Sequence, residues 1–267
     1  MGTADTKPKK NSDFSVIILG SGTCVPSLKR SACSVLMAFG DQRLLFDLGA
    51  GTMCRLLEAD VSIFEIGAVF FSHFHPDHTG ELASFMFANK YPDGNRRKGP
   101  LTLIGGNGFK KFFSGLQKAY GRWIELKPEM LKLVELGTKG NERVALDSVT
   151  VRVAPMAHNV ESLAYRVTTT DGRAVVYSGD TDFNEDLISL SEGADVLICE
   201  SATPDELKVK GHLTPSLAGT IATRAGVGRL VLTHLYPECD GVDIIAQCRK
   251  TYAGLLTTAT DLMKIDI

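Results

Sequence analysis

The sequence predicts an α/β fold in a single domain. Short apolar runs recur with helical segments between some of them, and no Pro- or Ser-rich linker interrupts the chain. Its 267 residues suit one large domain, and the 44% of hydrophobic residues can build a sizeable core. Continuous apolar runs are typical of strands that are covered on both faces. The pattern therefore fits a layered α/β/β/α sandwich, with a mixed α/β sheet as the alternative.

The expected elements follow from these runs, which often end in Gly, His or Asp. Strands are predicted at residues 14–20, 34–40, 43–49, 68–73, 101–105, 131–136, 149–154, 163–168, 174–180, 195–201 and 229–234. Helices are predicted at residues 51–59, 78–89, 108–120, 215–226 and 242–252. Gly226 and Gly254 are typical helix stops. We expect a loop at residues 90–100, on the rim of a site.

Composition limits the classes of protein that this chain fits. Residues 1–13 predict a disordered lead-in, and residues 14–267 a folded domain. The net charge of −2 does not favour a dedicated nucleic-acid binder. No run reaches the roughly 18 apolar residues of a membrane span, so we expect no membrane partner. The six scattered cysteines are typical of reduced thiols and predict a cytoplasmic protein.

The segment SHFHPDHTGEL (72–82) has the strongest chemical signature. His73, His75, Asp77 and His78 follow directly after an apolar strand. Imidazole suits zinc, iron or nickel, and a carboxylate adds negative charge. Alternate side chains of an extended segment share a face, so His73 and His75 are expected to hold one ion. Asp77 and His78 lie where the loop turns into a helix and are expected to reach a second ion.

Four side chains cannot complete two metal shells, so further ligands are expected at other strand ends. His158 follows the run VTVRVA, Asp180 ends AVVYSGD, and His234 ends RLVLTH. Each lies just past a predicted strand, where it can point into one shared cleft. The sequence therefore predicts seven metal-ligating residues around one site.

The segment HFHPDH resembles the HxHxDH signature of the metallo-β-lactamase superfamily, and the order of the later ligands is similar. The resemblance extends over residues 14–236 and implies a four-layer αββα sandwich with the metals at one edge. It implies two divalent ions. Zinc is the expected metal, with manganese, iron or nickel as alternatives. It also implies His73, His75 and His158 on one ion, Asp77, His78 and His234 on the other, and Asp180 as the bridge.

Within the superfamily the chain is most similar to ribonuclease Z and related phosphodiesterases. LGSGTCVPSLKRSACS resembles their Gly-rich start, and FDLGAGT, GHLTP and LTHLYP resemble their later motifs. The usual ribonuclease Z proteins carry a tRNA-gripping arm between the positions matched by His158 and Asp180. Here only residues 159–179 separate those two positions. We therefore expect a smaller phosphodiester or nucleotide-type substrate, with tRNA and a homodimer left open.

Catalytic roles are assigned to Asp77, His212 and Glu200. The resemblance implies that a hydroxide bridging the two ions attacks the phosphodiester. His212, the histidine not used as a ligand, is expected to protonate the leaving oxygen. Thr214 and Pro215 suit the N-cap and first turn of the next helix, which would fix the loop of His212. Glu200 is expected either to support the site or to cap the next segment.

Three questions stay open at the level of the sequence. Asp47 is interpreted as orienting a ligand histidine, with a turn-forming role as the alternative. A lactone, thioester or β-lactam is the alternative substrate, because the same hydroxide attacks a carbonyl. A di-iron redox or oxygen-binding protein is the alternative of another class, although such members usually carry a flavodoxin-like partner domain that this chain lacks.

Overall fold

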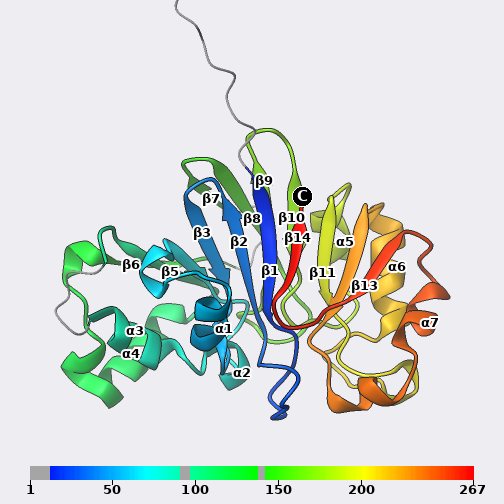
Figure 1. Ribbon diagram of the computed structural model, residues 1–267, viewed down its shortest axis with the longest axis horizontal. Coiled ribbons are helices and arrows are strands. Elements are labelled where there is room, and N and C mark those ends of the chain that lie inside the picture. The colour runs from blue at the N-terminus through cyan, green and yellow to red at the C-terminus, as the bar shows by residue number, and fades with distance from the viewer. Residues whose placement is uncertain (1–12, 91–96, 138–141) are drawn as a thin grey trace, which may run out of the picture.

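The computed structural model describes residues 13–90, 97–137 and 142–267. These residues form two seven-stranded sheets with helices on both outer surfaces (Figure 1). Helices α3 (Leu82–Lys90) and α4 (Phe109–Tyr120) lie on one side, and α6 (Pro215–Ala225) lies on the opposite side. The expected four-layer αββα sandwich is thereby confirmed. The expected lead-in, except for Asp13, and residues 91–96 of the expected loop lie outside the described residues.

The first sheet has the strand order β14-β1-β2-β3-β4-β5-β6. Its strands are β1 (Phe14–Gly20), β2 (Ser34–Phe39), β3 (Gln42–Phe46), β4 (Ala68–Phe70), β5 (Leu101–Gly105), β6 (Leu131–Glu135) and β14 (Met263–Asp266). The strands from β3 to β6 are parallel, and those from β14 to β3 are antiparallel. Helix α1 (Thr52–Glu58) lies on the same half as α3 and α4, and the short α2 (Pro76–Thr79) lies at the edge of the sheet.

The second sheet has the order β13-β12-β11-β10-β9-β8-β7. Its strands are β7 (Arg143–Leu146), β8 (Val149–Pro155), β9 (Leu163–Thr169), β10 (Ala174–Tyr177), β11 (Val196–Glu200), β12 (Arg229–Thr233) and β13 (Leu255–Thr258). Strands β10 to β13 are parallel. Helices α5 (Glu185–Ser191) and α7 (Ile244–Arg249) join α6 on its outer face. Their apolar side chains pack on that face in one cluster.

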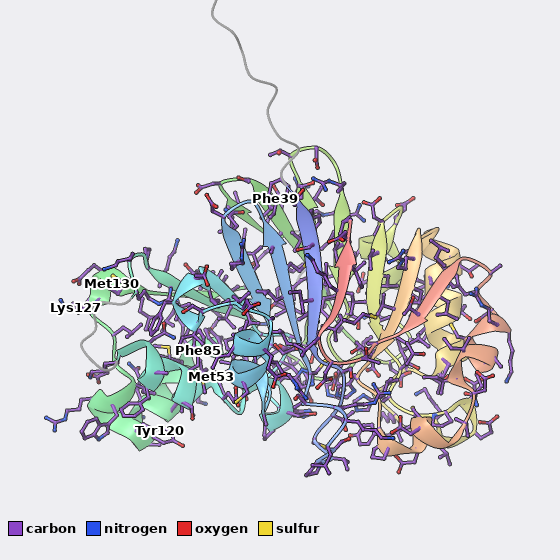
Figure 2. The ribbon with its side chains drawn as sticks, viewed as in Figure 1. Phe39, Met53, Phe85, Tyr120, Lys127 and Met130 are labelled. Carbon is purple, nitrogen blue, oxygen red and sulfur yellow. The ribbon has the colours of Figure 1, made fainter. Side chains whose placement is uncertain are left out.

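Three apolar clusters hold the layers together. Between the sheets, the ring of Phe46 stacks on that of Phe70 with centroids 4.9 Å apart, and Tyr165 packs edge-on against Phe70. The other two clusters lie between each sheet and its helices. Figure 2 shows Phe85 and Met53 on the helical side of the first sheet. Both faces of each sheet are therefore covered, which explains the continuous apolar runs.

Several elements differ from the sequence prediction. Strands β7, β13 and β14 and helix α5 were not expected. The helix predicted at residues 78–89 is two helices, α2 and α3, which Gly80 and Glu81 separate. Gly226 ends α6 in a left-handed conformation, with φ of 63°, as expected. The expectation for Gly254 is wrong, because α7 already ends at Arg249.

Candidate metal centre

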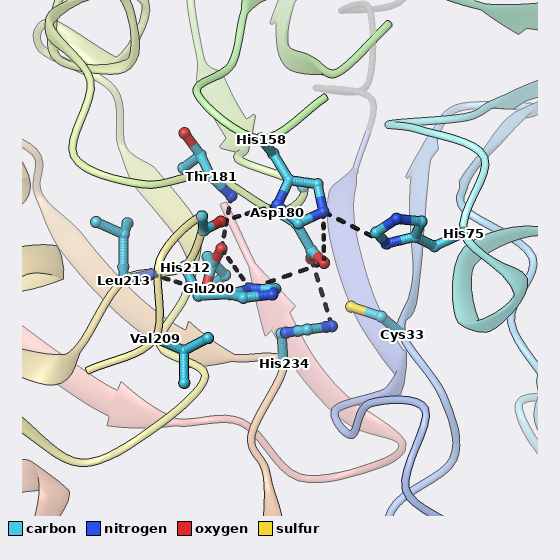
Figure 3. A network of polar contacts seen from close by, with 12 residues as sticks. Cys33, His75, His158, Asp180, Thr181, Glu200, Val209, His212, Leu213 and His234 are labelled. Carbon is cyan, nitrogen blue, oxygen red and sulfur yellow. Dashed lines mark hydrogen bonds and ion pairs between the residues drawn. The ribbon is translucent and has the colours of Figure 1, made fainter. Parts of the chain in front are cut away.

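The predicted ligands stand where strands from both sheets end. His73 follows β4, and His75, Asp77 and His78 lie in the loop and the short helix α2 behind it. From the second sheet, His158 follows β8, Asp180 follows β10 and His234 follows β12. The carboxyl ends of parallel strands share one edge of a sheet, so these residues meet there. Figure 3 shows His75, His158, His234 and His212 around Asp180.

Asp180 lies at the centre, with each carboxylate oxygen facing a different pair of imidazoles. Its Oδ1 is 3.3 Å from Nε2 of His78 and 3.4 Å from Nε2 of His234. Its Oδ2 is 3.6 Å from Nε2 of His73 and 3.9 Å from Nε2 of His158. The side chain is almost fully buried. Asp180 is thus shared by two sets of nitrogen ligands.

Two groups of ligand-type atoms contain the seven predicted ligands. One contains His73, His75, His158 and Asp180, and the other contains Asp77, His78 and His234. Within each group the ligand atoms lie within 4.8 Å of one another. Asp77 Oδ2 is 3.5 Å from Nε2 of His234 and 3.8 Å from Nε2 of His78. These are the groups that the resemblance implies, and their roles as ligands stay a prediction.

Hydrogen bonds on the far side of the rings fix which nitrogen faces the centre. Nδ1 of His78 donates to Asp47 at 2.7 Å, and Nδ1 of His158 donates to the carbonyl of Gly211 at 2.9 Å. Nδ1 of His73 lies 3.1 Å from the hydroxyl of Ser72, which itself donates to Asp47. A neutral imidazole protonated on Nδ1 keeps its lone pair on Nε2. In their neutral forms, the three rings therefore direct the Nε2 lone pairs at the centre.

The converging atoms fit metal ions. Nε2 of His73, Nε2 of His78, Nε2 of His234 and Oδ1 of Asp180 are buried and have no hydrogen-bond partner among the described residues. The lone pair of a neutral imidazole that faces a carboxylate repels it, and buried polar atoms without partners cost free energy. A cation at this place removes both penalties. Imidazole with carboxylate is a donor set of zinc, iron and manganese sites.

The electrostatics of the centre also favour positive charge. Burial lowers the pKa of His78, but the carboxylates of Asp180 and Asp47 outweigh it and hold that pKa well above its usual value. Burial opposes ionisation of Asp180, yet the histidines around it, His234 first, hold its pKa well below the usual range. Burial and then the nearby His78 lower the pKa of His73, which keeps that ring neutral and able to bind a metal.

Asp47 orients His78, as the sequence suggested. Its backbone has a positive φ of 60°, and its buried carboxylate also accepts from the backbone N–H of Ser72 and from the hydroxyl of Tyr177 at 2.6 Å. The alternative role is present too, because Asp47 turns the chain at the end of β3. The sequence analysis did not single out Ser72 or Tyr177. The only sequence signal for these two residues was their position, since Ser72 lies one residue before His73 and Tyr177 lies three residues before Asp180.

His212 and Glu200 form a pair beside the two ligand groups. Nδ1 of His212 donates to Oε1 of Glu200 at 3.2 Å and lies 3.9 Å from Oδ2 of Asp180. The buried Glu200 ends β11 and also accepts from the backbone N–H of Thr181 and Leu213. Burial lowers the pKa of His212, but the hydrogen bond with Glu200 and its charge outweigh this and raise that pKa. Glu200 therefore supports both the loop and the histidine.

The loop of His212 is held differently from the expectation. Thr214 occupies the N-cap position of α6 with Pro215 in the first turn, but the Thr214 side chain makes no capping hydrogen bond. The loop is held instead by Asp182, which accepts from the backbone N–H of Gly211 at 2.9 Å and from Lys208. His212 also groups with Asp180 and His234 as atoms able to hold a metal, so its separation from the ligands stays a prediction.

Comparison with known proteins identifies the family. The sequence model of a beta-lactamase superfamily domain matches residues 43–235. A ribonuclease Z of Mycobacterium bovis is 30% identical over 276 aligned residues, which cover 94% of this chain and 98% of that protein. The chain belongs to the beta-lactamase superfamily. It is a metal-dependent hydrolase and is related to ribonuclease Z proteins.

Solved structures agree with this family on the level of the fold. The metallo-beta-lactamase fold protein YhfI from Bacillus subtilis superposes with a TM-score of 0.80 at 24% identity, covering 96% of this hydrolase and all (100%) of that chain. The short form of human tRNase Z gives a TM-score of 0.74 at 23% identity, covering 94% of this hydrolase and 98% of that chain. Both comparisons therefore extend over the two sheets and their helices.

Two further observations concern the cysteines and membranes. No disulfide is formed among the described residues, where all the cysteines are free. None of the helices in the described part of this hydrolase has the length and apolar character that a membrane crossing requires.

Proposed function

We propose that this hydrolase cleaves phosphodiesters at a site with two divalent metal ions, for which zinc is the first candidate. His73, His75 and His158 would hold one ion, Asp77, His78 and His234 the other, and Asp180 both. The observation that carries the proposal is the position of Asp180, whose two oxygens face two separate groups of ligand-type side chains. The likeness to a protein named ribonuclease Z supports a phosphodiester as the substrate.

The chain's own residues divide the work of the reaction. When bound, two divalent cations supply nucleophilic water near neutral pH and offset the charge of the phosphate. Asp77 reaches both its ligand group and the wall of a neighbouring cavity, so it can orient water or substrate there. His212, with its pKa raised by Glu200, can carry the proton that the leaving oxygen requires. Glu200 positions that imidazole through Nδ1.

A substrate panel tests the proposal. The purified protein, its metal content measured, is assayed on bis(p-nitrophenyl) phosphate, on cyclic, linear and RNA phosphodiesters, and on lactones, thioesters and a β-lactam. We expect turnover of at least one phosphodiester class, and little turnover of the carbonyl esters. Hydrolysis confined to carbonyl substrates would overturn the phosphodiester proposal. A visible absorption spectrum of iron with no hydrolysis would favour the di-iron redox alternative.

Asp180→Ala tests whether the site is dinuclear. Because Asp180 faces both ligand groups, its loss should lower the metal content from about two ions per chain and abolish most activity. The matched control is Asp186→Asn, an exposed carboxylate on α5, which should keep both. Inductively coupled plasma mass spectrometry counts the metals, and circular dichroism checks the fold. A folded Asp180→Ala protein with the full metal content would contradict the bridging role.

A further inference from the structure

Two cavities adjoin the metal centre, one lined in part by His212 and the other in part by Asp77. One has a volume of about 370 Å³, and its lining includes Ala202, Thr203, Leu207, Val209, His212 and Tyr236. The other has a volume of about 490 Å³, and its lining includes Thr23, Cys24, Ser27, Arg30, Ala50 and Asp77. We call the first the His212 pocket and the second the Asp77 pocket. Both volumes lie in the range of small-molecule sites.

Contacts around His234 connect the linings of the two pockets. The ring of His234 stacks on that of His212 at 5.5 Å, and its Nε2 is 3.5 Å from Asp77. Farther out, Sγ of Cys24 contacts the hydroxyl of Tyr236 at 3.5 Å, which joins the two linings. A phosphodiester has two ester arms. A phosphate beside Asp180 can therefore direct one arm into each pocket.

We propose that the His212 pocket binds the leaving alcohol, as a flat, uncharged group of nucleoside or aryl size, and that the Asp77 pocket receives the retained group. This inference rests on the proposed phosphodiesterase function. It names which arm of the substrate leaves and what chemistry that arm has.

Proton transfer decides which arm of the substrate occupies which pocket. Water adds its oxygen to phosphorus, the bond from phosphorus to the leaving oxygen breaks, and its electron pair stays on that oxygen. The leaving oxygen takes a proton from His212, while the proton lost by water returns to the solvent, so the products are a phosphomonoester and an alcohol. An acid must lie within about 3 Å of the oxygen that it protonates. The leaving group must therefore occupy the pocket that His212 lines.

The walls of the His212 pocket indicate what it binds. Leu207 and Val209 are 52% and 49% exposed, which is high for large apolar side chains, and the ring of Tyr236 lines the same pocket. Figure 3 shows Val209 beside the loop of His212. Aromatic rings and aliphatic walls suit the flat face of a base or aryl group. The carboxylate of Glu238 also lines this pocket and disfavours a further phosphate on the leaving group.

The pocket is preformed by its own hydrogen bonds. The hydroxyl of Thr203 donates to the carbonyl of Leu207 at 2.9 Å. Asp205 accepts from the backbone N–H of Ser216 at 3.1 Å, which ties the wall to the start of α6. Because these polar groups are already bonded within the chain, Leu207 and Val209 present their apolar side chains to the ligand. A preformed apolar wall binds without ordering a loop first.

Unsymmetrical methyl and naphthyl phosphodiesters test which pocket holds the leaving group and which holds the retained group. The first ratio compares kcat/KM for 2-naphthol and phenol as leaving groups, with a methyl group retained. The second compares naphthyl and methyl as retained groups, with p-nitrophenol leaving. Val209→Trp narrows the His212 pocket and should lower the first ratio about tenfold, the order of loss that a changed pocket wall produces. It should leave the second ratio within about twofold.

Ser27→Trp is the matched control, because Ser27 lines the Asp77 pocket. It should lower the second ratio and spare the first. Equal changes of both ratios in both variants, or the reverse pattern, would overturn the inference. Binding of 2-naphthol, followed by its fluorescence, gives a second measurement that needs no turnover. If the wild-type protein cleaves no diester, the proposed function fails, and the pocket inference fails separately if Val209→Trp binds 2-naphthol as well as the wild type does.

Discussion

At the scale of single residues, the metal centre depends on histidine rings that contacts to Nδ1 hold in place. His73, His78 and His158 each bind a neighbour through Nδ1 and direct Nε2 at Asp180. The sequence indicated four of the candidate ligands because three histidines and an aspartate crowd one short segment. It predicted the supporting contacts only in part. Ser72 and Tyr177 carry common side chains with no special spacing, and only the folded strands bring them to Asp47.

His212→Ala tests the acid at this scale. If His212 protonates the leaving oxygen, its loss should slow esters with poor leaving groups by roughly 10²–10⁴-fold. Esters of p-nitrophenol should lose much less, because that leaving group departs without a proton. Steady-state rates on both kinds of ester, with metal content measured in parallel, check this. Equal losses on both, or a missing metal ion, would remove His212 from the acid role.

At the scale of elements, the prediction succeeded for the strands that are buried on both faces and missed three of the four edge strands, β7, β13 and β14. Strand β7 alternates between exposed and half-buried residues, and β13 and β14 are short outer strands. The helix after the HxHxDH motif is divided at Glu81, whose backbone N–H donates to the carbonyl of Leu48 at 3.1 Å. Glu81 accepts from the backbone N–H of Gly51 and Met53, at the start of α1. Its side chain thus serves the neighbouring helix, which a single-segment pattern cannot indicate.

Gly179→Ala tests the turn between β10 and Asp180. Gly179 has a positive φ of 56°, and an added Cβ would lie 2.5 Å from Cβ of Ser72. We expect a lower melting temperature and weaker metal binding, because Ser72 contacts both Asp47 and His73. Differential scanning calorimetry and metal titration measure the two effects.

Gly115→Ala is the matched control for this variant. Gly115 lies inside α4, where an added Cβ meets nothing within 4 Å. Replacing a helix-interior glycine by alanine should stabilise the fold by about 0.5–1 kcal/mol. Metal affinity should stay unchanged. A Gly179→Ala protein as stable as the wild type would show that the contact with Ser72 is not tight.

At the scale of the whole molecule, the segment between His158 and Asp180 bears on the substrate. It consists of β9 and β10 joined by a short turn, and the two strands pair along their length. We therefore expect poor cleavage of precursor tRNA relative to small diesters, because no arm projects from this segment. Gel analysis of a precursor tRNA beside a small diester, at equal enzyme and metal concentrations, checks this. Efficient and correctly placed 3′ cleavage would show that another surface grips the tRNA.

The position of the ligands also has a consequence for assembly. His73, His75, Asp77 and His78 belong to the half built on the first sheet, whereas His158, Asp180 and His234 belong to the half built on the second. Neither half alone carries a full ligand group, since Asp77 and His78 complete theirs with His234 and the other group spans both halves. Metal ions bound between the two halves would hold them together. Their binding free energy would then add to the free energy that docks one sheet on the other.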